Sequence, residues 1–221
     1  VPAFLGSSFA FLGGYAVVAP MLDDGTPNME MLPYACGGVF CAGLVYLLLA
    51  ALIKGFGAKR VMKFFPPEVT GPIIISIGLI LAPSAIDNCA TNWPIALIAL
   101  ITVIVFNIWG RGMAKIVPIL IGVAVSYIAA IIMGEVDFSG IGEEAVIGLP
   151  DFILMKFDVS AIITIMPIAL ATMMEHIGDI SAIGATTGKN YIAQPGLHRT
   201  LLGDGLATCL AAAVGAPANT T

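Results

Sequence analysis

The sequence predicts an all-α polytopic membrane protein, and three observations support this fold class. Of its 221 residues, 59% are hydrophobic and only 10% are charged, whereas globular proteins average about 45–50% and 25%. The mean hydropathy is +1.02. Apolar runs recur along the chain at close to the ~20 residues that cross a ~30 Å hydrocarbon core. The lipid bilayer is therefore the expected environment, and the composition indicates no nucleic-acid partner.

Seven apolar runs are candidate transmembrane segments, and the first three differ in character. Residues 1–22 are interrupted by small polar or glycine residues at 6–8 and 13–14, which predicts a discontinuous helix with exposed backbone near mid-membrane. Residues 33–53 form a continuous span. Residues 66–82 begin with a Pro-Pro pair, which suits a helix N-terminus, although the run is short.

The remaining four runs complete the predicted topology. Residues 93–109 and 116–133 carry aromatic residues of the kind found at membrane interfaces. Residues 159–177 end in two carboxylic acids, and residues 200–214 contain Asp204. Each of the last two runs therefore combines the length of a membrane span with ionisable groups.

The basic residues give the orientation. Alternate loops lie on one side of the membrane, so the loops after the second, fourth and sixth spans share a face. Those loops hold eight of the nine basic residues: Lys54, Lys59, Arg60, Lys63, Arg111, Lys115, Lys189 and Arg199. The other loops hold Lys156 and most of the acids: Asp23, Asp24, Glu30, Asp87, Glu135, Asp137, Glu143, Glu144, Asp151 and Asp158. Lysine and arginine concentrate in cytoplasmic loops, so the basic face is predicted to be cytoplasmic.

Three acids remain inside the predicted spans, because Glu68 starts a helix on the cytoplasmic side. Glu175 and Asp179 are four residues apart, which places them on one helix face with about 5–6 Å between Cβ atoms. A carboxylate at the bilayer centre costs about 2.5–3.5 kcal/mol, so such acids usually face a polar cavity. The pair therefore predicts a substrate or proton site.

Structural roles are the alternatives for the other ionisable groups. Asp204 lies between two glycines near the cytoplasmic end of its span, where it would also suit the cap of a broken helix. His176 points roughly 100° away from Glu175, so a hydrogen bond between packed helices is its favoured role over direct proton transfer. His198 belongs to a predicted cytoplasmic turn. Small residues from Gly178 to Gly188 suit a helix-packing face.

The cysteines predict no metal site and no cofactor. Cys36, Cys41, Cys89 and Cys209 lie mostly in apolar surroundings, and no C-x-x-C or Cys/His cluster is present. Free cysteine is among the most buried residue types. All four are expected to be reduced, structural thiols.

Several motifs resemble those of one transporter family. They are the Glu-His-Ile-Gly-Asp run at 175–179, the Gln-Pro-Gly-Leu-His-Arg turn at 194–199, the Leu-Gly-Asp-Gly run at 202–205 and the Pro-Ala-Asn-Thr-Thr ending at 217–221. Their order and spacing resemble the nucleobase-ascorbate transporters, also called the nucleobase:cation symporter-2 family. Residues 1–11 resemble the start of that family's third transmembrane segment. Within the family, the motifs are most similar to those of bacterial uracil permeases.

The resemblance implies a fold of fourteen transmembrane segments in two inverted repeats of seven. The chain would be an internal fragment of such a protein, covering the third to the ninth segments. Residues 1–53 and 159–221 would belong mainly to its core domain and residues 66–133 mainly to its gate domain, through which a homodimer would form. Residues 7–11 would form one short strand at the binding site, and the second would follow Thr221.

The resemblance also implies roles for individual residues. Glu175 matches the family's base-binding glutamate, and Ser8 and Phe9 lie at the strand whose backbone binds the base. Asp179, Asp204 and His176 are the candidates for proton coupling. The best-known uracil carrier has histidine where this chain has Asp179.

The function implied is proton-coupled uptake of uracil by alternating access across the bacterial cytoplasmic membrane. Xanthine or another nucleobase is the alternative substrate within the family. An intramembrane enzyme or an ion channel is the alternative from another class. The chain contains no H-E-x-x-H motif or comparable catalytic set, and no repeated pore-lining acids or filter loop. The sequence therefore favours a carrier over both.

The uneven basic residues predict which loops face the cytoplasm. A cysteine replacing Glu143 should react with a membrane-impermeant thiol reagent added to intact cells, whereas a cysteine replacing Lys59 should react only after lysis. The opposite labelling pattern would show that the topology is inverted.

Overall fold

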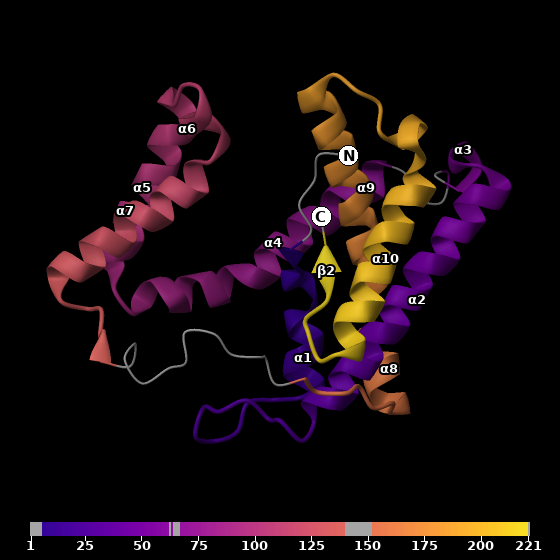
Figure 1. Ribbon diagram of the computed structural model, residues 1–221, viewed down its shortest axis with the longest axis horizontal. Helices are drawn as coiled ribbons and strands as arrows, with labels where there is room; N and C mark the ends of the chain where they lie inside the picture. Colours follow the sequence, from indigo (N-terminus) through magenta and orange to yellow (C-terminus); the bar gives the residue numbers. More distant parts are fainter. Residues whose placement is uncertain (1–5, 62, 64–66, 140–151, 221) are drawn as a thin grey trace. The chain divides into compact units, whose positions relative to one another are not determined.

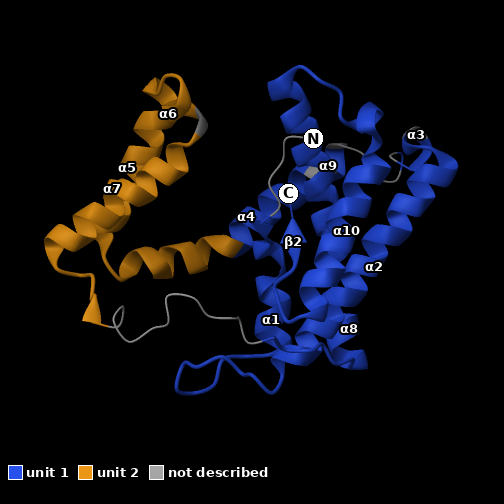
Figure 2. Cartoon of the chain, in the orientation of Figure 1, with its two compact units in different colours: residues 1–80, 151–221 blue, residues 81–150 orange. Residues whose placement is uncertain are grey.

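The computed structural model describes residues 6–61, 63, 67–139 and 152–220, and these residues are mostly helical (Figure 1). The chain divides into two compact units (Figure 2). The first comprises Val1–Ile80 and Asp151–Thr221, and the second comprises Leu81–Pro150. The expected division into core and gate ranges stays a prediction.

The first unit carries all the predicted site residues. Its elements are β1 (Gly6–Ser7), η1 (Phe9–Phe11), α1 (Leu12–Val18), α2 (Leu32–Phe56), α3 (Ala58–Val61), α8 (Val159–Ile165), α9 (Ile168–Thr187), η4 (Ile192–Gly196), α10 (Leu197–Ala213) and β2 (Asn219–Thr220). Helix α4 (Pro67–Ala90) begins in the first unit and ends in the second.

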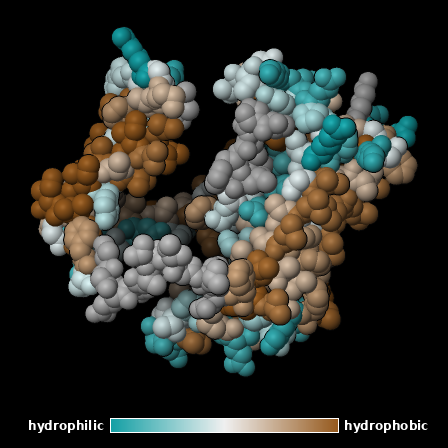
Figure 3. Space-filling view, viewed as in Figure 1, coloured by the Kyte–Doolittle hydropathy of each residue, from teal (hydrophilic) through white to brown (hydrophobic). Residues whose placement is uncertain are grey.

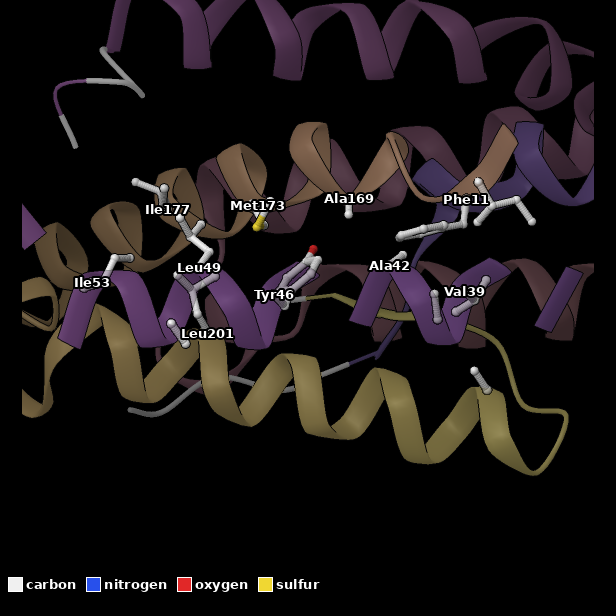
Figure 4. Packing of buried hydrophobic residues seen from close by; sticks show 14 of the residues in the cluster. Phe11, Val39, Ala42, Tyr46, Leu49, Ile53, Ala169, Met173, Ile177 and Leu201 are labelled. Carbon is white, nitrogen blue, oxygen red and sulfur yellow. The ribbon is translucent and has the colours of Figure 1, made fainter. Parts of the chain in front are cut away.

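Helix α2 is the centre of the first unit. It begins with a proline in its first turn and ends at Gly57, whose φ of 87° is unfavourable for other residues. Its packing partners are α10, α8, α9 and α1. Buried side chains recur every three or four residues along α2 and form one face of the helix (Figure 4). They are Ala35, Val39, Ala42, Tyr46, Leu49 and Ile53. This face meets Phe11, Met173, Ile177 and Leu201 in one hydrophobic core.

Glycine allows α2 and α10 to cross closely. A Cβ atom on Gly205 would lie 2.8 Å from the Cβ of Tyr46, and one on Gly43 would lie 2.6 Å from the Sγ of Cys209. The Cys209 thiol lies 3.6 Å from the Phe40 carbonyl oxygen. Membrane helices have no hydrophobic drive to associate in lipid, so small residues at the crossing raise their van der Waals contact.

The two short strands pair antiparallel, with Gly6 opposite Thr220 and Ser7 opposite Asn219. The Ser8 amide donates to the Ala218 carbonyl at 2.8 Å. The strand expected at residues 7–11 is therefore misplaced, because residues 9–11 form η1 instead. The strand pairing thus ends at Ser8, and the chain turns into η1 at Phe9.

The partner strand was also expected in the wrong place. It was predicted to follow Thr221, whereas β2 lies within the chain at Asn219–Thr220. Its position is fixed by α10, since the Asn219 amide donates to the Thr208 hydroxyl at 3.3 Å. The Asn-Thr-Thr ending thus brings the last described residues to the N-terminal segment of the chain.

Several predicted span boundaries need correction. Among the described residues 6–22, the first span contains β1, η1 and α1, and its two helices are much shorter than the predicted range of residues 1–22. Helix α4 continues to Ala90, so Asp87 lies in a helix and not in a loop. The sixth span breaks between α8 and α9 and then continues to Thr187, ten residues beyond the prediction. The fifth and seventh spans begin close to their predicted starts, and Trp93–Trp109 is confirmed.

Backbone bonding explains why α9 outlasts its apolar run. The Ser181 hydroxyl donates to the Ile177 carbonyl at 2.7 Å, and the Thr186 hydroxyl donates to the Ala182 carbonyl at 2.9 Å. Such bonds satisfy polar side chains within their own helix. Hydropathy alone therefore underestimates the length of this helix.

The second unit contains α5 (Trp93–Trp109), α6 (Met113–Ile116) and α7 (Pro118–Met133). Helices α5 and α7 pack closely, since a Cβ atom on Gly122 would lie 2.5 Å from a Val103 methyl carbon. The Asn92 amide group joins the two helix ends by donating to Glu135 at 3.1 Å. Hydrophobic residues cover much of the face of these helices that Figure 3 shows.

Helix lengths agree with a membrane protein. Among the described residues, Leu32–Phe56, Gly71–Ala90 and Val159–Thr187 are long and apolar enough to cross a bilayer. Trp93–Trp109 and Pro118–Met133 are shorter apolar helices. Their exposed side chains include many leucines and isoleucines. A lipid environment is the simplest account of so much exposed apolar surface.

The close crossing of α2 and α10 predicts different effects for two glycines of α10. Gly205→Ala should destabilise the folded carrier by about 1–3 kcal/mol, the usual range for overpacking. Gly203→Ala is the matched control, because no atom lies within 4 Å of its Cβ position. It should be neutral or slightly stabilising, since alanine favours helix. Thermal unfolding of purified variants measures both, and equal midpoints would contradict the packing described.

Candidate functional site

Helix α9 presents its ionisable residues on two different faces. Glu175 and Asp179 are partly exposed, whereas His176 is 1% exposed. The helical rotation of about 100° between neighbouring residues produces this separation. The predicted shared face of Glu175 and Asp179 is therefore present, and His176 points into the packed interior.

His176 approaches Asp204 across the α9–α10 contact. Its Nδ1 atom lies 3.1 Å from Asp204 Oδ2, and Asp204 is also 1% exposed. The two residues are 28 positions apart in the sequence, and each would be costly to bury alone. The helix-packing role predicted for His176 agrees with this position.

The Asp204 carboxylate has spare acceptor capacity. Within the described part of the chain, neither of its oxygens accepts a well-aligned hydrogen bond, although Oδ2 is close to His176. One oxygen of Glu175 is likewise buried without such a partner. Buried unsatisfied polar atoms are uncommon in native proteins and often mark functional sites or bound water.

Electrostatic interactions link the three membrane acids. Glu175 interacts with Asp179 on its own helix and with Asp204 on α10, and Asp179 interacts with His176. The structure therefore brings together all four ionisable residues predicted for substrate binding or proton coupling in this region. They form a cluster from two helices, which we call the acid cluster: Glu175, His176, Asp179 and Asp204.

Two hydroxyl residues beside the acid cluster were not predicted. Tyr46 of α2 is 1% exposed, and its hydroxyl interacts with Asp204 and Glu175 and adjoins Thr172 of α9. Thr172 is fully buried and donates within its own helix to the Ala169 carbonyl at 3.2 Å. The sequence does give one indication of Tyr46, because it places this polar hydroxyl near the middle of a strongly apolar span.

Ser8 and Phe9 lie at the junction of β1 and η1. Ser8 is 6% exposed and its hydroxyl has no hydrogen-bond partner among the described residues, whereas Phe9 is 66% exposed. The 3-10 turn packs against α9. Both residues line a cavity of about 420 Å³ together with Ser7, Leu12, Tyr15, Leu32, Gly215 and Pro217.

The two parts of the predicted substrate site are on adjoining elements, because η1 packs against α9. Glu175 is not among the residues that line the 420 Å³ cavity. Ser8 and Phe9 are held by the strand pair, and Glu175 is held by α9. The contact between η1 and α9 thus supports the proximity of Ser8 and Phe9 to the helix that carries Glu175.

The C-terminal end of α9 holds a second cavity of about 370 Å³. The small residues predicted to pack helices, including Gly184 and Gly188, line this cavity with Lys189 and Asn190. His198 lies in the first turn of α10 and not in a loop, with its ring against Gly196. Gly196 has a φ of 103°, which ends the turn before α10.

Loop acids outside the spans are held by local hydrogen bonds. The hydroxyl and amide of Thr26 donate to Asp24 and lower the pKa of its carboxyl group. The Ser139 amide acts similarly on Asp137 and lowers its pKa. Among the described residues, no group of three His, Cys, Asp or Glu side chains is arranged to hold a metal ion.

Known proteins match the whole chain. It matches the permease family over residues 1–221. It is 39% identical to the "Probable uracil permease" of Haemophilus influenzae, covering 100% of this chain and 54% of that protein. It is 38% identical to the "Uracil permease" of Bacillus caldolyticus, covering 100% and 53%.

A third relative is named for a broader class of substrates. The chain is 32% identical to the "Putative pyrimidine permease RutG" of Escherichia coli, covering 100% of this chain and 51% of that protein. The chain thus spans about half the length of the curated relatives it matches. Its full-length match, apolar helices and buried acid cluster agree, and the chain belongs to the permease family, which consists of transport proteins and not of enzymes.

Proposed function

We propose that the longer protein containing this chain imports uracil in symport with protons, across the cytoplasmic membrane of a bacterium. Relatives named as uracil permeases support a nucleobase substrate, and their bacterial origin supports a location in a bacterial membrane. The substrate is expected to reach the site from alternate sides of the membrane. The acid cluster supports this proposal, because buried acids in membrane proteins usually mark substrate or proton paths.

The position of Glu175 carries the proposal. It lies on the accessible face of α9, while its neighbour His176 is sealed against α10. A carboxylate accepts hydrogen bonds, and uracil is a flat, neutral molecule with N–H donors along its edge. Glu175 therefore binds the base through its N–H groups, while the buried face of α9 keeps the helix in place.

Ser8 and Phe9 provide the opposite side of the base site. The Ser8 hydroxyl is free to bond a substrate, whereas its amide is already bonded to Ala218. The Phe9 amide is at the start of η1, where amide groups lack helical partners. The exposed Phe9 ring offers an apolar face to a planar base.

Protons are held by the remaining members of the acid cluster. Asp179 is partly exposed one turn from Glu175, so it can exchange a proton with the substrate cavity. Asp204 and His176 store or relay charge in the interior. Proton movement at Asp179 and base binding at Glu175 are coupled because the two carboxylates repel each other when both are ionised.

The complete protein is expected to contain two inverted repeats of seven segments. The pairing of β1 with β2 supports this arrangement, since it joins segments from opposite ends of the chain. Residues 1–53 and 159–221 would form most of the core domain. Residues 66–133 would form most of the gate domain and the homodimer contact.

A different nucleobase is the second candidate substrate. The relative named as a pyrimidine permease supports a site that accepts more than uracil. Competition of labelled uracil uptake by unlabelled thymine, cytosine and xanthine separates the candidates. If xanthine alone competed strongly, the protein would be a purine carrier.

Substitution of the paired acids should separate binding from coupling. Glu175→Gln replaces one acceptor oxygen with a donor that faces a substrate donor, which should weaken uracil binding about ten- to a hundredfold. Asp179→Asn imitates a protonated acid, so it should still bind uracil but lose accumulation driven by a pH gradient. Binding to purified full-length variants and uptake into vesicles measure the two properties.

The order of the two effects decides the proposal. Wild-type affinity in Glu175→Gln would remove the base-binding role of Glu175. Normal gradient-driven accumulation in Asp179→Asn would remove Asp179 from the proton path. Leu170→Ala is a control for nonspecific damage to α9, because Leu170 is 51% exposed on the same helix.

A further inference from the structure

Tyr46 places a phenol hydroxyl at the meeting point of three helices. Its side chain is the largest of those that are almost completely buried. Figure 4 shows its oxygen pointing from α2 toward the α9 residues Met173 and Ala169. On its other side, the Tyr46 Cβ adjoins Gly205 of α10. The ring is therefore fixed between α9 and α10.

The hydroxyl has an unmet hydrogen-bonding requirement. Among the described residues, the Thr172 hydroxyl adjoins it, but no neighbour makes a well-aligned hydrogen bond to it, and the same is true of both Asp204 oxygens. Leaving a buried donor or acceptor unsatisfied costs about 1–3 kcal/mol. Phenylalanine would fill the same space at no such cost. The hydroxyl must therefore contribute something that packing does not require.

Complementary unsatisfied groups lie on neighbouring helices. Tyr46 has a donor hydrogen that can rotate about its C–O bond, and Asp204 has acceptor oxygens. Asp204 directly precedes Gly205, the residue that contacts Tyr46 from α10. Asp204 and Glu175 are the carboxylates that interact electrostatically with the hydroxyl. Both groups are directed toward α9, since the Tyr46 oxygen points toward it (Figure 4) and Asp204 Oδ2 lies 3.1 Å from His176 of that helix.

We propose that Tyr46 is a positioning residue for Asp204, with its hydroxyl donating to the carboxylate directly or through one ordered water molecule. His176 holds Asp204 from α9, and Tyr46 holds it from α2. This inference rests on the proposed role of Asp204 in proton coupling. It extends the acid cluster to a third helix, so that a change in charge at Asp204 is transmitted to α2 as well as to α9.

Spectroscopy tests the contact without relying on transport. In the full-length carrier, the infrared carboxyl band that is lost in Asp204→Asn belongs to Asp204. This band should shift in frequency in Tyr46→Phe, because a hydrogen-bond donor to the carboxylate has been removed. Tyr191→Phe is the matched control: Tyr191 is 9% exposed and lies outside the acid cluster. It should leave the band unchanged.

Transport assays test the consequence. Uracil accumulation driven by a pH gradient should fall about tenfold in Tyr46→Phe, the effect of losing roughly one hydrogen bond. Uracil counterflow at equal pH requires no net proton movement and should remain near wild type. Adding Tyr46→Phe to Asp204→Asn should cause no further loss, because the two residues act on one group.

The outcomes separate this inference from the proposed function. An unshifted band in Tyr46→Phe overturns the inference, whatever transport shows. A proportional loss of accumulation and counterflow, with a lower unfolding midpoint, also overturns it and assigns Tyr46 a packing role. A shifted band with normal accumulation in Asp204→Asn supports the contact and contradicts the proton role proposed for Asp204.

Discussion

Burial of the contact between His176 and Asp204, where α9 meets α10, is the constraint on which the site depends. The His176 and Asp204 side chains approach within 3.1 Å and are almost inaccessible to solvent. Loss of the His176 side chain would leave the Asp204 carboxylate buried without this contact, at a cost of about 3–5 kcal/mol. The pair therefore fixes the rotation of α9 about its axis. That rotation turns Glu175 and Asp179 toward the accessible side.

Close helix packing makes this pairing possible. Gly205 follows Asp204 and lets α10 approach α2 until its backbone contacts Tyr46. The same contact brings a phenol hydroxyl beside the acid cluster. Thus a close helix crossing at Gly205, the buried His176–Asp204 contact and the partly exposed Glu175 carboxylate all belong to one region of the first unit. A substitution at any of these three places is therefore expected to disturb the geometry of the other two.

Sequence reasoning predicted the helical class, most spans and the importance of the Glu175–Asp179 run, because hydropathy and helical spacing are local properties. It also predicted that His176 points away from Glu175. The pairing of His176 with Asp204 was not predicted, since it depends on the approach of α9 and α10. The sequence indicated a helix-packing histidine but provided no partner for it.

The remaining errors have similar physical causes. The strand positions depend on pairing between Gly6–Ser7 and Asn219–Thr220, which are distant in sequence. The length of α9 depends on hydroxyl groups that bond to their own helix backbone. Tyr46 was overlooked because a buried aromatic residue in an apolar span resembles ordinary core. Only its neighbours reveal the unsatisfied hydroxyl.

The central claim is that one face of α9 is sealed while the other binds substrate, and cysteine accessibility tests it most directly. Single cysteines at Met173→Cys and Asp179→Cys, in a full-length carrier without other cysteines, are treated with a small charged thiol reagent. The account predicts no reaction at position 173 and reaction at position 179 that saturating uracil slows. Equal reaction at both positions, or no effect of uracil at position 179, would contradict it.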